Sequence, residues 1–173
     1  MNLEDHIACV PDFPRPGILF RDVTGILESH EAFSYTIDSL LDKLNGIDFD
    51  KIAGVESRGF IFGAPLSCRA GVGFIPVRKA GKLPRAVIHQ EYDLEYGTAA
   101  LEIHANSIKP GQKVVIIDDL LATGGTVEAT CKMIERLGGI VVKILFVVEL
   151  EGLNGREKLK KYDVASLLTL PGE

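Results

Sequence analysis

The chain of 173 residues has no tryptophan, only three cysteines, no tract of basic residues and no apolar run long enough to span a membrane. The cysteines, Cys9, Cys68 and Cys131, are odd in number and lack the spacing of metal ligands, so we expect buried, reduced thiols and a cytoplasmic location. A net charge of −5 argues against a nucleic-acid partner. The acidic N-terminus lacks the apolar segment of a secretion signal, and no membrane association is expected.

The length and a 46% share of hydrophobic residues fit one globular domain over residues 1–173, since no repeat or linker divides the chain. Apolar residues at helical spacing predict helices over 31–44, 60–69 and 127–137. Short apolar, β-branched runs predict strands over 52–55, 74–77, 99–104, 114–117, 141–150 and 164–170. This alternation favours an α/β fold with a mostly parallel sheet covered by helices on both faces. Ligands of such sheets bind beyond the C-terminal strand ends.

Three segments stand out from this alternation. Residues 80–96 lack a clean apolar period, so we expect a long mobile loop that serves as a lid or binding loop. Pro76 indicates that the strand 74–77 lies at an edge or ends there. In the N-terminal region 1–30, two prolines and a glycine make the approach to Phe20 rigid. This segment is expected to form a hood whose Phe20 stacks on a flat base, and the alternative is a rigid surface loop with a buried phenylalanine.

The most informative stretch runs from Val114 to Thr126. Its apolar strand is followed by Asp118 and Asp119 and then by a turn of small residues, Ala122, Thr123, Gly124, Gly125 and Thr126, that leads into a helix. Glycines let backbone N–H groups approach an anion closely, and the helix N-terminus favours negative charge. The two carboxylates are suited to sugar hydroxyls or, through water, to Mg²⁺. The run therefore points to a phosphorylated sugar, although an ordinary buried strand with a solvated acidic turn is the alternative.

A second strand-to-helix turn carries Ser57 and Arg58, whose amides and guanidinium could hold another anion. A basic cluster of Arg78, Lys79 and Lys82 follows the next strand. Taken alone, each is a helix cap or a solvated charge run. Beside a first phosphate site, they suit a ligand that is phosphorylated at both ends.

Five motifs occur together and in order, at residues 16–22, 57–60, 78–84, 92–97 and 118–126, and Gly155–Leu159 is a sixth match. With them the chain resembles the type I phosphoribosyltransferases, and among these the members that use adenine, over residues 11 to 168. The resemblance implies purine salvage: the phosphoribosyl group of phosphoribosyl pyrophosphate (PRPP) passes to adenine, which gives AMP and pyrophosphate.

The resemblance also implies a role for each motif residue. Ala122 to Thr126 bind the 5′-phosphate, and Asp118 and Asp119 bind the ribose hydroxyls and Mg²⁺, the metal mostly through water and PRPP. Pyrophosphate is expected at Ser57, Arg58, Arg78, Lys79 and Lys82, and adenine at Leu19, Phe20, Arg21 and Leu150. Glu95 is expected to handle the proton at adenine N7 or N9, with an exposed acid at a loop end as the alternative.

A homodimer is implied as well, in which Arg78 and Lys79 could serve the site of the partner subunit. Three other functions remain open from the residues. They are a phosphoribosyltransferase for orotate, xanthine or hypoxanthine, a PRPP-sensing regulator, and a sugar-phosphate-binding module. The segment around Phe20 argues against the first, and Glu95 argues against the second.

Overall fold

The computed structural model describes residues 1–94 and 97–172, and its main sheet is mostly parallel. The parallel strands are β3 (Lys51–Val55), β4 (Gly73–Lys79), β7 (Lys113–Leu121), β8 (Ile140–Glu151) and β9 (Val164–Pro171). An antiparallel pair, β5 (Val87–Leu94) and β6 (Gly97–His104), extends the sheet beyond β4. The order β5-β6-β4-β3-β7-β8-β9 confirms the predicted α/β fold.

Helices cover both faces of this sheet because its central strands are apolar on both sides. In β7, Val114 and Ile116 face the core that contains α4 (Gly125–Arg136). Val115 and Ile117 face the opposite core, formed with α2 (His30–Asp42) and α3 (Arg58–Ala70). All four side chains are fully buried, as two-sided burial of a parallel strand requires. The predicted helices and strands are confirmed with bounds that move by one or two residues, except that the strand predicted over 114–117 continues to Leu121 and therefore includes Asp118 and Asp119.

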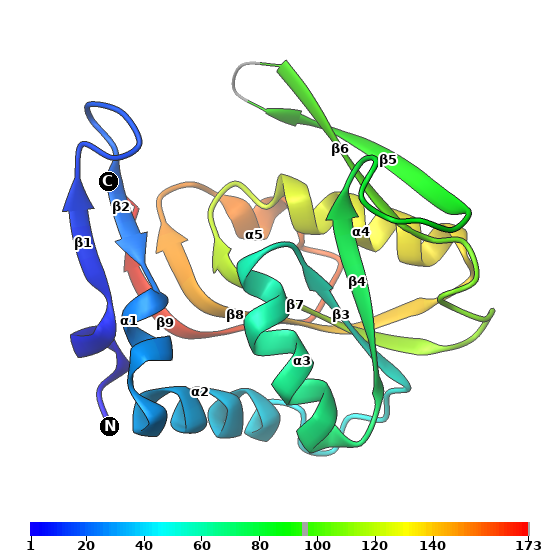
Figure 1. Ribbon diagram of the computed structural model, residues 1–173, viewed down its shortest axis with the longest axis horizontal. Coiled ribbons are helices and arrows are strands. Elements are labelled where there is room, and N and C mark those ends of the chain that lie inside the picture. The colour runs from blue at the N-terminus through cyan, green and yellow to red at the C-terminus, as the bar shows by residue number, and fades with distance from the viewer. Residues whose placement is uncertain (95–96, 173) are drawn as a thin grey trace.

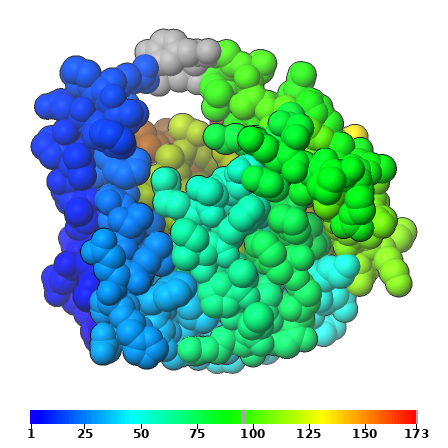
Figure 2. All heavy atoms as spheres, in the orientation of Figure 1, coloured from blue at the N-terminus to red at the C-terminus, as the bar shows by residue number. Residues whose placement is uncertain are grey.

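The N-terminal region carries a second, two-stranded sheet at one end of the molecule (Figure 1), and its buried side chains join the core that contains α2. Its elements are η1 (Leu3–His6), β1 (Ala8–Pro11), β2 (Leu19–Asp22) and α1 (Thr24–Glu28), and β1 pairs with β2 antiparallel. The pair β5–β6 rises at the opposite end (Figure 1). Figure 2 shows the surface hollowed between these two parts, with the segments near residues 120 and 150 at the floor. The fold thus leaves an open site over the ends of β7 and β8.

The expectation of an irregular loop over 80–96 is wrong for 87–94, which is strand β5, while 80–86 form an irregular connection. Ile88, Gln90 and Tyr92 are half-buried and alternate with exposed residues, which is the period of a strand with one covered face. The exposed face carries the polar residues His89, Glu91 and Asp93. Glu95, the predicted proton-handling residue, and Tyr96 lie outside the described residues.

The thiols are also less uniform than predicted. Cys131 is buried on α4, but Cys68 and Cys9 are exposed. Cys68 is exposed because α3 directs Phe62 and Leu66 toward the sheet and leaves Cys68 on the outer side of the helix. The prediction of buried thiols is therefore correct only for Cys131.

Pro76 lies in β4, between β3 and β6 in the sheet. Only Arg78 and Lys79 of β4 pair with β6, so Pro76 itself pairs on one side, with Gly54 of β3. A proline is tolerated there because its missing N–H faces no partner strand. No helix in the part of the chain that the structure describes is long and apolar enough to cross a membrane.

Candidate active site

The two anion-binding turns predicted from sequence lie side by side. β3 and β7 are parallel neighbours, with Gly54 opposite Ile117, so the turns that follow them emerge at the same edge of the sheet. A cleft of about 340 Å³ opens between them. Its lining comprises Val55, Glu56, Ser57, Arg58, Lys79, Tyr92, Leu101, Asp118, Asp119, Leu120 and Thr126. The fold therefore unites both turns with one basic residue from β4.

A smaller cavity of about 80 Å³ adjoins this cleft and is formed by the segment Ala122–Thr126, which we call the phosphate loop. Gly124 precedes α4 with φ of +83°, a conformation that only glycine adopts without strain. It makes no side-chain cap bond to the first turn of α4. The loop thus presents backbone N–H groups and a helix N-terminus, the arrangement that suits a phosphate.

Two carboxylates separate the turns. Asp118 is half-buried, and its Oδ1 accepts a hydrogen bond of 2.9 Å from the backbone N–H of Asp119. Burial, together with the charge of Asp119, raises the pKa of Asp118 well above its usual value. Asp119 is 6% exposed and forms an ion pair with Arg58, whose Nε donates to Oδ2. The sequence placed these three residues in one site, but it did not show that Arg58 binds Asp119.

Arg58 also reaches the N-terminal hood. Its guanidinium lies over the ring of Phe20, 5.6 Å from the centroid, where the electron-rich face attracts a cation. Partial burial alone would lower the pKa of Arg58, but the hydrogen bond and charge of Asp119 raise it above its ordinary value. Arg58 therefore connects Phe20, the predicted base-stacking residue, to Asp119, the predicted ribose ligand.

Glu56 is a site residue that sequence reasoning missed. Its carboxylate accepts a hydrogen bond of 2.7 Å from the Lys79 N–H and one of 3.3 Å from Arg78 Nη2. Burial raises the pKa of Glu56, but these hydrogen bonds and both cations lower it further, so the net shift is downward. The only signal in the sequence was its position directly before Ser57 and Arg58. Glu56 holds the basic end of β4 against the first turn.

The remaining predicted residues are less closely grouped. Arg21 donates to Cys9 Sγ (2.7 Å) and to the Pro171 carbonyl (3.0 Å), so its side chain ties β2 to β1 and to the end of β9. Leu19 is half-buried on β2, and Leu150 packs on the core beneath α2. Lys82 is exposed in the connection after β4, outside the cleft lining given by the described residues.

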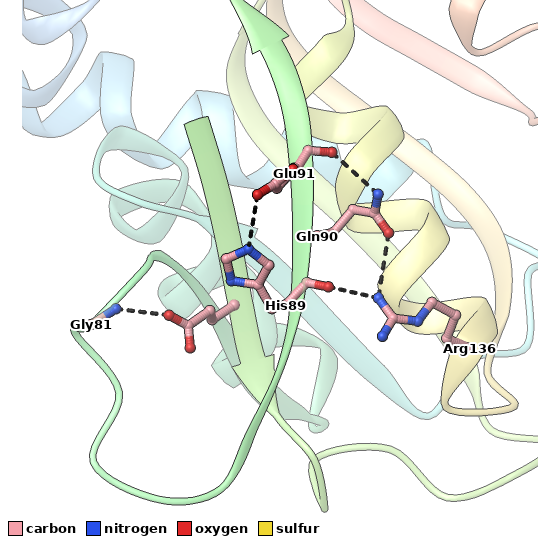
Figure 3. A network of polar contacts seen from close by, with 6 residues as sticks. Gly81, His89, Gln90, Glu91 and Arg136 are labelled. Carbon is pink, nitrogen blue, oxygen red and sulfur yellow. Dashed lines mark hydrogen bonds and ion pairs between the residues drawn. The ribbon is translucent and has the colours of Figure 1, made fainter. Parts of the chain in front are cut away.

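Tyr92 is a second residue that the sequence interpretation missed, because the segment around it was assigned to a loop. It lines the cleft from β5. β5 is held against α4 by Arg136, whose Nη1 donates to the His89 carbonyl (2.7 Å) and to Gln90 Oε1 (3.4 Å), as Figure 3 shows. The alternation of Ile88 and Tyr92 was the signal that could have identified both the strand and its inward face.

Comparisons with known proteins give a consistent result. The family model described as "Phosphoribosyl transferase domain" matches residues 24–170. The chain is 59% identical to an adenine phosphoribosyltransferase of Lachnoclostridium phytofermentans over 99% of both chains. The crystal structure of adenine phosphoribosyltransferase from Thermoanaerobacter pseudethanolicus is 54% identical and superimposes with a TM-score of 0.95 over 97% of this chain and 98% of that one.

A second similar structure carries ligands. It is the Saccharomyces cerevisiae adenine phosphoribosyltransferase, complexed with adenine and an imino-altritol bisphosphate. It is 41% identical, with a TM-score of 0.91 and coverage of 96% of both chains.

Proposed function

Since the chain belongs to the adenine phosphoribosyltransferases, which convert adenine and PRPP to AMP and pyrophosphate in purine salvage, we propose that the cleft between its two strand-to-helix turns is the active site. The observation that carries the proposal is the juxtaposition of the phosphate loop, the paired carboxylates and Arg58 at one edge of the sheet. Each matches one part of PRPP: the 5′-phosphate, the ribose diol and the pyrophosphate.

The chemistry that these residues must perform is the separation of pyrophosphate from C1 of the ribose while positive charge develops on the ring. The phosphate loop holds the 5′-phosphate, and Asp118 and Asp119 orient the ribose hydroxyls, which fixes C1 in place. Ser57, Arg58 and Lys79 face the leaving pyrophosphate, with Arg78 and Lys82 as further cations, and they stabilise the negative charge that it gains.

Adenine is placed beside C1 by the hood. Phe20 and Leu150 pack on the rings, and main-chain groups near Leu19 and Arg21 recognise the edge of the base. A 6-oxo purine would leave such buried groups unpaired, which accounts for the choice of adenine over hypoxanthine or guanine. Arg58 lies on Phe20 in this structure, so the guanidinium must move aside when the base stacks there.

Mg²⁺ is part of the proposal. Within residues 1–94 and 97–172, the structure holds no group of three or more His, Cys, Asp or Glu side chains that could hold a metal ion. The carboxylates of Asp118 and Asp119 nevertheless have the hard oxygen ligands that Mg²⁺ prefers, with water and PRPP oxygens as the remaining ligands. When bound, the ion neutralises charge on the pyrophosphate.

We also propose a homodimer located in the cytoplasm, with Arg78 and Lys79 near the neighbouring subunit's site. The free cysteines suit a reducing compartment. Sedimentation equilibrium tests the dimer directly, and a monomer at micromolar concentration would contradict it.

The assignment of the site is tested by pyrophosphate release from PRPP with each purine in turn, with and without Mg²⁺. We expect release with adenine, little with hypoxanthine or guanine, and none after the metal is removed by a chelator. Equal use of hypoxanthine would contradict the role of the hood.

Glu95→Gln is expected to lower kcat far more than it raises the PRPP KM. The matched control is Glu91→Gln on the exposed face of β5, which is expected to keep normal turnover.

A further inference from the structure

One motif that carries the family resemblance, Gly155–Leu159, has no part in the proposed function. It begins with the short helix α5 (Gly155–Lys158) and lies between β8 and β9 in the sequence. In space it contacts the phosphate loop, which precedes it by about thirty residues in the SEQ numbering. The contact is made by backbone atoms, and it explains why the motif begins with glycine.

Two glycines meet at this contact. A Cβ atom on Gly155 would lie 2.3 Å from the Ala122 carbonyl oxygen, and it would also contact the side chain of Leu121 at 2.8 Å. A Cβ atom on Gly124 would lie 2.7 Å from the Gly155 carbonyl oxygen. Neither position has room for a methyl group, so the two backbones touch. Gly155 therefore sets how far the phosphate loop can move toward α5.

Arg156 fixes Gly155 to the sheet. Its guanidinium donates to both oxygens of Glu149 on β8, from Nε at 2.6 Å and from Nη2 at 2.7 Å. Its Nη1 donates to the Val164 carbonyl at 3.1 Å, where β9 begins. The second oxygen of Glu149 also accepts a hydrogen bond of 2.7 Å from Ser166. A planar, bidentate ion pair of this kind specifies position as well as adding energy.

The other end of the motif is anchored in the core. Leu159 is fully buried in the cluster that also holds Leu121 of β7. Leu121 is itself opposite Glu149 in the β7–β8 register. The contacts therefore form a closed circuit from Glu149 through Arg156 and Gly155 to the phosphate loop, and back along β7.

We propose that Glu149, Arg156 and Gly155 are positioning residues, which hold the phosphate loop in the shape that binds the 5′-phosphate of PRPP and AMP. The inference rests on the proposed function, because it takes Ala122–Thr126 as the 5′-phosphate site. A loop of glycines and small residues has little stiffness of its own, and Gly124 caps α4 without a side-chain bond. Convergent N–H groups must be held within a fraction of an ångström, so the constraint has to come from outside the loop.

This role differs from a purely stabilising one. The Arg156 side chain is half exposed, so solvent screens part of the energy of its ion pair with Glu149. The loss of the pair should therefore appear in ligand affinity more than in the melting temperature. The affinity should fall only for ligands with a 5′-phosphate, and the affinities for adenine and pyrophosphate should stay the same.

The test compares Gly155→Ala, Arg156→Lys and Arg156→Ala in the full chain. We measure the AMP dissociation constant by calorimetry, KM for PRPP and adenine, kcat, and the melting temperature. Displacement of the loop should weaken AMP binding and raise the PRPP KM by about 10- to 100-fold, with Arg156→Lys at the low end because it keeps the charge. The adenine KM and the affinity for inorganic pyrophosphate should not change.

Two further variants make the result decisive. Asp163→Asn is the matched control, because it removes the 2.9 Å Lys143–Asp163 ion pair on the same strand, β8, away from the loop. Gly125→Asp adds a negative charge to the loop at a position where the nearest atoms to a Cβ are 3.7 Å away. If Gly125→Asp leaves AMP binding intact, the 5′-phosphate assignment of the proposed function is wrong.

A second outcome is that Gly125→Asp weakens AMP binding while the Gly155 and Arg156 variants behave like Asp163→Asn. In that case the support role, meaning the positioning of the phosphate loop by Glu149, Arg156 and Gly155, is wrong and the proposed function stands. A parallel loss of AMP, adenine and pyrophosphate binding would also overturn the support role, since it would indicate a general distortion. Selective loss of AMP and PRPP affinity in the Arg156 variants, with unchanged binding of adenine and pyrophosphate, supports it. A lower melting temperature is expected for Gly155→Ala alone, because its Cβ would clash with the buried Leu121 side chain.

Discussion

The turns after β3 and after β7 lie next to each other and both face the cleft, yet they are built by opposite means. The turn after β7 is made of glycine and small residues, and it presents backbone N–H groups. The turn after β3 presents side chains, and its cation, Arg58, is already bound to Asp119 and to the face of Phe20. A glutamate also lies near each turn. Glu149 binds Arg156, next to Gly155, and Glu56 accepts a hydrogen bond from the Lys79 N–H.

The difference suggests what each turn can do during a reaction. A backbone cradle has no side chain to rearrange, so it suits the 5′-phosphate, which stays in the same place in substrate and product. An arginine that can exchange partners suits a leaving group, because Arg58 can bind pyrophosphate and return to Asp119 after release. In this proposal the turn after β7 holds a fixed backbone site, and the turn after the neighbouring strand β3 supplies an arginine that exchanges partners.

The largest effect is expected for Arg58→Gln. It removes a cation that contacts both Asp119 and Phe20, and kcat/KM for PRPP should fall by about 100- to 1000-fold, as for the loss of a donor to a developing anion. Arg69→Gln on the same helix removes an exposed ion pair to Asp38 and serves as the control. Steady-state kinetics with saturating adenine measures both. Equal activity of the two variants would mean that Arg58 has no role at the leaving group.

The next largest effect is expected for Gly124→Ala, which tests the backbone turn. Alanine is strained at φ of +83°, and its Cβ would meet the Gly155 carbonyl at 2.7 Å, so the AMP dissociation constant should rise by about 100-fold. Gly46→Ala is matched for strain, with φ of +78° and nothing within 4 Å of its Cβ. It should lose some stability but keep its AMP affinity. Calorimetric titration with pyrophosphate should show no change for either variant.

A smaller effect is expected for Glu56→Gln, which loosens only the side-chain turn. The affinity for pyrophosphate should fall by about 10-fold, since a hydrogen bond to a charged group is worth about 1.5–3 kcal/mol, while AMP affinity stays constant. Because folding lowers the pKa of Glu56, its ionised form stabilises the native state above the ordinary value of 4.5. The melting temperature of the wild type should therefore exceed that of Glu56→Gln above pH 4.5, and this gap should close as the pH falls through the lowered pKa. If the difference in melting temperature widens as the pH falls, folding does not lower the pKa of Glu56.

The smallest effect concerns the two helices that follow the turns. Burial raises the pKa of the Cys131 thiol on α4 to about 12, whereas Cys68 on α3 is exposed. A maleimide at pH 7 should label Cys68 and the exposed Cys9 quickly and leave Cys131 unlabelled, as peptide mapping by mass spectrometry would show. Urea should make all three react. Fast labelling of native Cys131 would show that α4 is less firmly packed than α3.

Much of this molecule follows from local sequence. The four apolar β-branched residues before Asp118 predict a strand buried on both faces, and glycines at 124 and 125 predict an anion-binding turn, because both depend on neighbours within a few positions. The alternation of strands and helices then places the 57–58 and 118–126 turns at one edge of the sheet. The same local reasoning failed at β5. This strand is covered on one face only, so its apolar residues are few and were not recognised as a strand pattern.

The sequence by itself therefore determined the strands and helices of the parallel part of the sheet and the two turns, since hydrophobic period and turn chemistry act over short distances. It did not determine β5 or the N-terminal elements. The tertiary structure alone decided the partners. Arg58 meets Asp119 and Phe20, Glu56 meets Lys79, and Gly155 supports Gly124 only because packing brings distant segments together. No local pattern encodes such contacts. They depend on strand order, on side-chain volume and on where two backbone segments pack so closely that a Cβ atom has no room.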